Sequence, residues 1–122
     1  MISAVGNDAD EVFQVLKTAK TGIGRISLLE TVHTDELPAG EIKLSNGQLR
    51  EMAEMPARYP CSRTGLLGLI AARQAVRQAK IRDMGEFRTG LVSGTTAGGM
   101  DRSEVFYRSF LDDAGKGRLR DV

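Results

Sequence analysis

The sequence is poor in the residues that form disulfide bonds or bind structural metals, with one cysteine and one histidine among 122 residues. A single cysteine, Cys61, excludes an internal disulfide and a zinc cage made of cysteines. No apolar run approaches the ~18 residues that a membrane span needs. Residues 1–20 hold acidic side chains and no long apolar block, so we expect no signal peptide. These absences predict a soluble, cytoplasmic protein.

The sequence also lacks an excess of charge of either sign, because its 17 basic and 16 acidic side chains nearly balance and leave a net charge of +1. A nucleic-acid binder would show a clear basic excess. The length is that of about one domain, and no repeat, linker or low-complexity segment divides it. We therefore expect a single domain over residues 1–122 that contacts neither nucleic acid nor membrane.

Catalytic groups are missing as far as residue chemistry alone can tell. His33 lies in a polar stretch where exposure to solvent is the ordinary outcome, and no sequence signature pairs it with Cys61 as a nucleophile's activator. The carboxylates follow no EF-hand pattern, and the turn over residues 94–99 lacks the Lys-Ser/Thr of a Walker loop. The residues predict no catalytic group, no metal and no cofactor.

Apolar residues at helical spacing predict four helices. The first follows a cap at Asn7 or Asp8 and ends at the turn over residues 21–24. That turn could also be a phosphate loop, but a dinucleotide fingerprint needs a third glycine where this chain has Ser27. The other helices are expected over residues 46–55, 63–79 and 102–111.

The helix expected over residues 63–79 has a face of small side chains. Ser62 precedes it and can cap it. A face without bulk allows another backbone to come close, which would offset the low helix propensity of its glycines. The members of this face are Thr64, Gly65, Gly68, Ala71, Ala72, Ala75 and Ala79.

The stretch over residues 88–101 organises the rest of the chain. Residues 90–92 are an apolar run typical of a buried strand, and three glycines between residues 94 and 99 allow a tight turn. Asp101 and Glu104 have capping-box spacing, and we expect Phe106 and Phe110 on the buried face of the helix that follows. Strand, turn and helix predict an α/β fold, in which such turns commonly line a ligand site.

Four segments together resemble the amino-terminal portion of the β-ketoacyl-[acyl-carrier-protein] synthases, the condensing enzymes of the thiolase superfamily. They are residues 2–7, the turn at 16–24, the arginine-containing, alanine-rich helix from Ser62, and the Gly-Thr-Thr-Ala-Gly-Gly turn within 88–101. The resemblance implies a thiolase-like layered α/β fold. It also implies that the chain is incomplete, lacking the family's first strand before Met1 and the catalytic portion beyond Val122.

The resemblance further implies a chemistry for the complete enzyme. An acyl group moves from acyl carrier protein to a cysteine, and the carbanion from decarboxylated malonyl-carrier protein attacks that thioester. The family's nucleophile, two histidines and a lysine lie downstream of the glycine turn, and Cys61 does not match the nucleophile's motif. We therefore expect no condensing activity from this chain alone.

One part of that machinery maps onto this sequence, the lining of the acyl pocket. By resemblance, Ala97 lines the pocket near the dimer interface together with Gly98 and Gly99. Because Ala97 is small, we expect the enzyme to accept long or bulky acyl chains. The expected partners are acyl carrier protein and either a second copy or a chain-length-factor subunit. Two alternatives stay open, a non-catalytic partner subunit of the chain-length-factor kind and a stand-alone α/β interaction domain.

Overall fold

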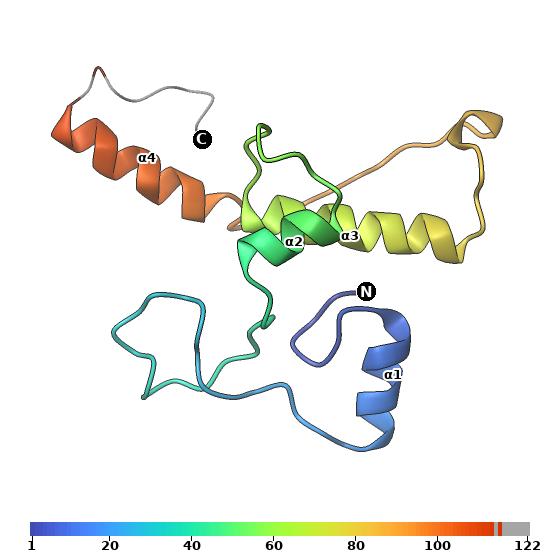
Figure 1. Ribbon diagram of the computed structural model, residues 1–122, viewed down its shortest axis with the longest axis horizontal. Coiled ribbons are helices and arrows are strands. Elements are labelled where there is room, and N and C mark those ends of the chain that lie inside the picture. The colour runs from blue at the N-terminus through green and yellow to red at the C-terminus, as the bar shows by residue number, and fades with distance from the viewer. Residues whose placement is uncertain (114, 116–122) are drawn as a thin grey trace.

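The computed structural model describes residues 1–113 and Gly115, and helices account for its regular structure (Figure 1). They are α1 (Ala9–Lys17), α2 (Asn46–Met52), α3 (Arg63–Gln78), the single 3-10 turn η1 (Met84–Glu86) and α4 (Met100–Asp112). The four predicted α-helices are confirmed, to within a few residues at their ends. Most of the loop expected after residue 112 falls outside the described residues. Within the described chain, none of these helices has the length and apolar character that crossing a membrane requires.

Side-chain caps determine where the first three helices begin. Asp8 accepts a hydrogen bond from the backbone N–H of Glu11 at 2.8 Å, and Ser62 accepts one from Gly65 at 3.1 Å. At α2, the side chain of Ser45 and that of Gln48 bond each other's backbone N–H groups in a capping box. Each cap satisfies donors that the first helical turn leaves free. The predicted caps Asp8 and Ser62 are therefore confirmed.

The core lies between α2 and α3, which pack side by side (Figure 1). Leu49 of α2 and Ala53, the residue directly after that helix, are fully buried against Leu66 and Ile70 of α3, which are 1% and 3% exposed. Burial of the leucine and isoleucine side chains stabilises this contact, because each aliphatic side chain removed from water contributes roughly 1.5–3 kcal/mol. α3 thus packs its large aliphatic side chains against α2, and its small-residue face points elsewhere.

The expected α/β layering is not confirmed, because the described residues contain no strand. Residues 88–95 run as a long extended trace between η1 and α4 (Figure 1), and no other described segment pairs with them. Leu91 and Val92, expected in a buried strand, are 81% and 99% exposed. A strand exists only when a neighbour satisfies its backbone groups. Elsewhere in the described chain only two isolated bridges form, Ser3 with Gly6 and Gly24 with Ala39.

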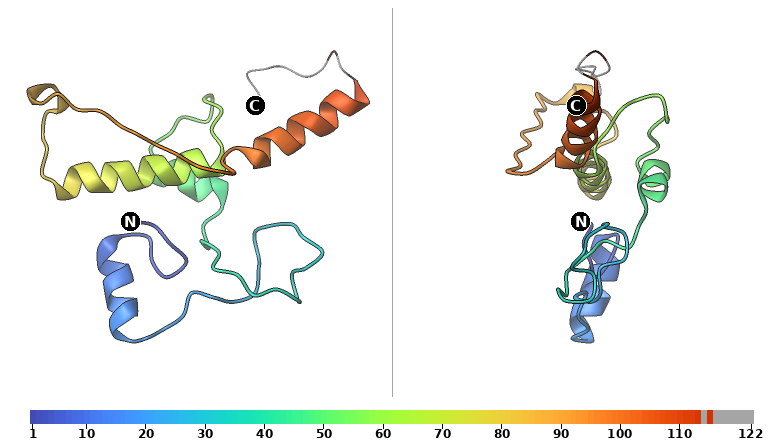
Figure 2. Two further views of the ribbon diagram at one scale, coloured as in Figure 1. Left: turned by 180° about the vertical axis from the view of Figure 1, so that it is seen from behind. Right: turned by 90° about the vertical axis from the view of Figure 1, so that its left-hand side faces the viewer.

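The apolar faces of the outer helices are less buried than their spacing predicted. In α1 only Val12 is buried, whereas Phe13 and Leu16 are mostly exposed. In α4 the rings of Phe106 and Phe110 stack on each other at 6.1 Å, and none of its residues is buried. Figure 2 shows α1 and the loop after it on one side of α3, with α4 leaving near the start of α3. No described element covers these faces.

A single carboxylate fastens the loop between α1 and α2. Glu41, whose side chain is only 11% exposed, accepts hydrogen bonds from the backbone N–H groups of Ser27, Leu28 and Leu29 at 2.8–3.0 Å. It also receives the ammonium of Lys43 at 2.6 Å. The Lys43 bond is the main reason that the pKa of Glu41 lies far below its ordinary value, and the N–H groups of Leu28 and Leu29 and the Ser27 hydroxyl lower it further.

Candidate functional site

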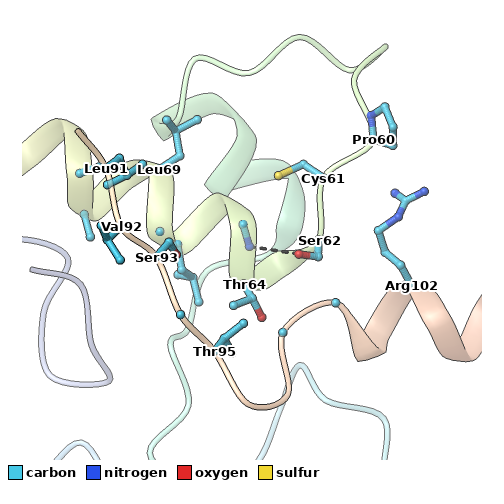
Figure 3. A pocket seen from close by; sticks show the side chains of 18 of the residues that line it. Pro60, Cys61, Ser62, Thr64, Leu69, Leu91, Val92, Ser93, Thr95 and Arg102 are labelled. Carbon is cyan, nitrogen blue, oxygen red and sulfur yellow. Dashed lines mark hydrogen bonds between the residues drawn. The ribbon is translucent and has the colours of Figure 1, made fainter. Parts of the chain in front are cut away.

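A groove of about 1080 Å³ runs along α3, between its small-residue face and the stretch over residues 91–95 (Figure 3). The turn before α4 and the start of α4 close one end. Most of its lining is apolar or lacks a large side chain. The lining residues are Pro60, Cys61, Ser62, Thr64, Gly65, Leu67, Gly68, Leu69, Ala71, Ala72, Leu91, Val92, Ser93, Gly94, Thr95, Gly98, Gly99, Arg102 and Ser103.

The floor of the groove is the face of α3 that the sequence marked as small. An ideal Cβ on Gly68 would meet no atom within 4 Å, so this part of the floor is open. A Cβ on Gly65 would come within 2.8 Å of the Cys61 sulfur, so a larger residue there would require the Cys61 side chain to shift. The predicted close approach of another backbone occurs at one end, where a Cβ on Gly98 would lie 3.2 Å from the Thr64 methyl carbon.

The glycine turn forms the end wall of the groove. A Cβ on Gly98 would lie 2.3 Å from a Thr95 methyl carbon, which excludes any larger residue without movement. Gly99 has φ 88°, a left-handed conformation that L side chains rarely adopt. Of the residues expected at an acyl pocket, Gly98 and Gly99 line the groove. Ala97 belongs to the same turn, but it is exposed and lies outside the lining residues.

The capping box expected at α4 does not form. Gly99 is the residue before the helix, and no side chain caps α4 there. Instead, the carboxylate of Asp101 accepts a hydrogen bond from the backbone N–H of Arg63 at 3.0 Å, across 38 residues of sequence. Asp101 therefore caps a backbone N–H in the first turn of α3, a different helix from its own. The spacing of Asp101 and Glu104 suggested a local cap, and nothing in the local sequence indicated the distant partner.

Arg63 joins three segments at the start of α3. Its guanidinium donates to the carbonyl oxygens of Ile42 and Leu44 at 2.7 and 2.8 Å and to the amide oxygen of Asn46 at 3.0 Å. Its backbone N–H donates to Asp101. Five-donor guanidinium groups suit such multiple contacts. The arginine at this place holds the approach to α2 and the entry to α4 around one helix end.

The titratable groups do not form a catalytic constellation within residues 1–113. His33 is exposed and bonds Glu36 at 2.9 Å in its own loop. Cys61 is half-buried on the groove wall. The described part of the chain holds no cluster of three His, Cys, Asp or Glu side chains placed to share a metal ion. The groove presents a mostly apolar surface.

Comparison with known proteins gives a distant similarity to one kind of enzyme. The chain is 26% identical over 113 residues to 3-oxoacyl-[acyl-carrier-protein] synthase 2 of Staphylococcus aureus, in strains N315 and Mu50 alike. The matched region is 91% of this chain and 27% of the relative, so the chain spans about a quarter of the length of the curated relatives it matches. No family model matches the chain. No solved structure matches it either. The similarity supports a relationship to the ketoacyl synthases.

Proposed function

We propose that this chain is the amino-terminal part of a β-ketoacyl-[acyl-carrier-protein] synthase. The observation that carries the proposal is the distant similarity, 26% identity over 113 residues, to an enzyme named 3-oxoacyl-[acyl-carrier-protein] synthase 2. The four resembling segments named in the sequence analysis occur in family order and fall across nearly the whole chain.

The proposed reaction is a decarboxylating Claisen condensation. An acyl thioester is transferred to a cysteine, and malonyl-carrier protein loses carbon dioxide. The carbanion that remains attacks the acyl carbonyl, so that a carbon–carbon bond forms and the cysteine sulfur leaves. Cys61 is not assigned the nucleophile's role, because its sequence context does not match the family's motif. We propose that this chain alone catalyses no condensation.

We propose that the glycine turn over residues 94–99 lines the acyl site of the complete enzyme. Gly98 and Gly99 form the end wall of an apolar groove next to Thr64, and the exposed residues Leu91 and Val92 line the same groove. An acyl chain would exchange water for this surface, and each buried methylene would contribute about 0.8 kcal/mol. Ala97 precedes the glycine pair and lies outside the lining of the groove in this chain. By the family resemblance, we propose that its small side chain leaves space for a long acyl chain in the complete enzyme. Acyl carrier protein and a second subunit are the proposed partners.

Substituting Ala97 tests this proposal. In the synthase that carries this chain, Ala97→Phe should shift the preference from long toward short acyl primers, measured by competing primers of increasing length. Ala57→Phe is the matched control, since Ala57 is likewise exposed but lies in the segment between α2 and α3 and not in the glycine turn. An unchanged preference in Ala97→Phe would contradict the role in acyl binding. Absence of malonyl-dependent condensation in the wild-type synthase would contradict the proposed function itself.

A further inference from the structure

Resting on the proposed function, we propose that Asp101 is a positioning residue that fixes the glycine turn against the start of α3 and so sets the width of the groove's end. The residue touches no reacting atom. It acts through Gly98 and Gly99, which it follows closely in the chain, and through Arg63, which it contacts across 38 residues.

Two side chains accept hydrogen bonds from backbone N–H groups in the first turn of α3. Ser62 accepts a hydrogen bond from the N–H of Gly65 at 3.1 Å, and the Asp101 carboxylate accepts one from the N–H of Arg63 at 3.0 Å. A carboxylate is favoured at a helix N-terminus because the free N–H groups carry partial positive charge. The bond to Asp101 is therefore a charge-assisted one, about twice as strong as a neutral one.

Packing contributes little to holding this part of the chain. No residue of α4 is buried, and Leu91 and Val92 are 81% and 99% exposed. The start of α3, which Asp101 contacts, is by contrast held by hydrogen bonds and by the core. Arg63 bonds two carbonyl oxygens before α2, and Leu66 in the same helix lies in the core.

The contact between Gly98 and Thr64 shows what Asp101 positions. An ideal Cβ on Gly98 would lie 3.2 Å from the Thr64 methyl carbon, so the turn and the helix lie close together there. Thr64 also lies opposite Thr95 across the groove (Figure 3). If the Asp101 bond is lost, the turn is free to move away from Thr64, and the end of the groove opens.

The first measurement needs no enzymatic activity. In the 122-residue chain, nuclear magnetic resonance should show a nuclear Overhauser effect between the Thr64 methyl group and the Gly98 α-protons. Asp101→Ala should abolish it and accelerate amide exchange at Arg63 by about tenfold, the worth of one hydrogen bond. Asp101→Asn keeps an acceptor oxygen and should retain the effect. Glu104→Ala, an exposed site in the same helix, should change neither readout.

Contacts between Leu49 and Leu66 report whether each variant keeps its core. An Overhauser effect that persists in Asp101→Ala, with unchanged exchange at Arg63, would overturn the positioning role. If Asp101→Ala does not keep its core, Asp101→Asn decides. Retention of the Thr64–Gly98 contact then supports the role, and its loss overturns it.

The second measurement asks about the acyl groove. In the synthase that carries this chain, Asp101→Ala should raise KM for long acyl primers by a larger factor than it lowers kcat, and Asp101→Asn should restore KM. Equal effects on long and short primers would overturn the link to acyl binding. A wild-type synthase without condensing activity would refute the proposed function, whereas the resonance data on Asp101 would still stand.

Discussion

The carboxylate of Glu41 and the ammonium of Lys43 lie 2.6 Å apart, and the same carboxylate accepts backbone N–H bonds from the turn at residues 27–29. Folding therefore lowers the pKa of Glu41 far below its unfolded value. A lowered carboxyl pKa stabilises the fold fully above the unfolded value of about 4.3 and loses that contribution as the pH falls further. We expect the stabilisation from Glu41 to be present at pH 7 and to decline below about pH 4.

Denaturant unfolding of the wild type and Glu41→Gln at pH 7 and pH 3 measures this contribution. Glu41→Gln should destabilise the chain at pH 7, and the difference from the wild type should shrink at pH 3. Glu51→Gln is the matched control, because Glu51 is exposed on α2. A Glu41→Gln difference that does not change with pH would show that the carboxylate's charge contributes nothing.

Leu66 is 1% exposed at the centre of the α2–α3 contact. Leu66→Ala leaves a cavity there, and we expect a loss of about 2–5 kcal/mol in the free energy of unfolding. Leu111→Ala makes the same change at a site that is 66% exposed, where the expected effect is within about 0.5 kcal/mol. Equal losses at the two positions would mean that the core is not where α2 meets α3.

Gly22 and Gly24 differ in the space around them, although they are two residues apart. A Cβ on Gly22 would lie 2.6 Å from a Val5 methyl carbon and 2.8 Å from the Ala4 carbonyl, whereas a Cβ on Gly24 would meet nothing within 4 Å. We expect Gly22→Ala to cost about 1–3 kcal/mol through overpacking. Gly24→Ala should be neutral or stabilise by about 0.4–1 kcal/mol. Thermal unfolding of both variants checks the order, and the reverse order would contradict the described turn.

Ser62 caps α3 through the N–H of Gly65. Ser62→Ala should lower the free energy of unfolding by about 1 kcal/mol, and Ser62→Asp should restore most of it. Ser93→Ala, at an exposed position outside any helix, provides the control. Circular dichroism during denaturant titration measures all three variants. A full loss in Ser62→Asp would show that the side chain does more than accept this bond.

Local signals in the sequence predicted the helices well, because each signal acts within three or four residues. Ser62 and Gly65, or Asp8 and Glu11, form a cap from positions three residues apart. The face of small residues on α3 followed from the same helical period, and the structure makes part of it the floor of the groove.

What the sequence did not predict depends on partners distant in the chain. The apolar residues at 90–92 suggested a strand, but a strand also needs a neighbour, and the described chain supplies none there. Helical spacing identified the face of Phe106 and Phe110 but not what would cover it. Asp101 has its partner 38 residues away. The acyl role of Ala97, Gly98 and Gly99 stays a prediction.

The exposure of Leu91 and Val92 has a consequence for the chain in solution. Leu91 and Val92 are neighbouring apolar residues in an extended backbone, and no other described residue pairs with their N–H and C=O groups. Such a segment is a template onto which an identical segment can add. Crowding copies together therefore favours intermolecular sheet growth, and dilution or a charged residue at position 92 opposes it.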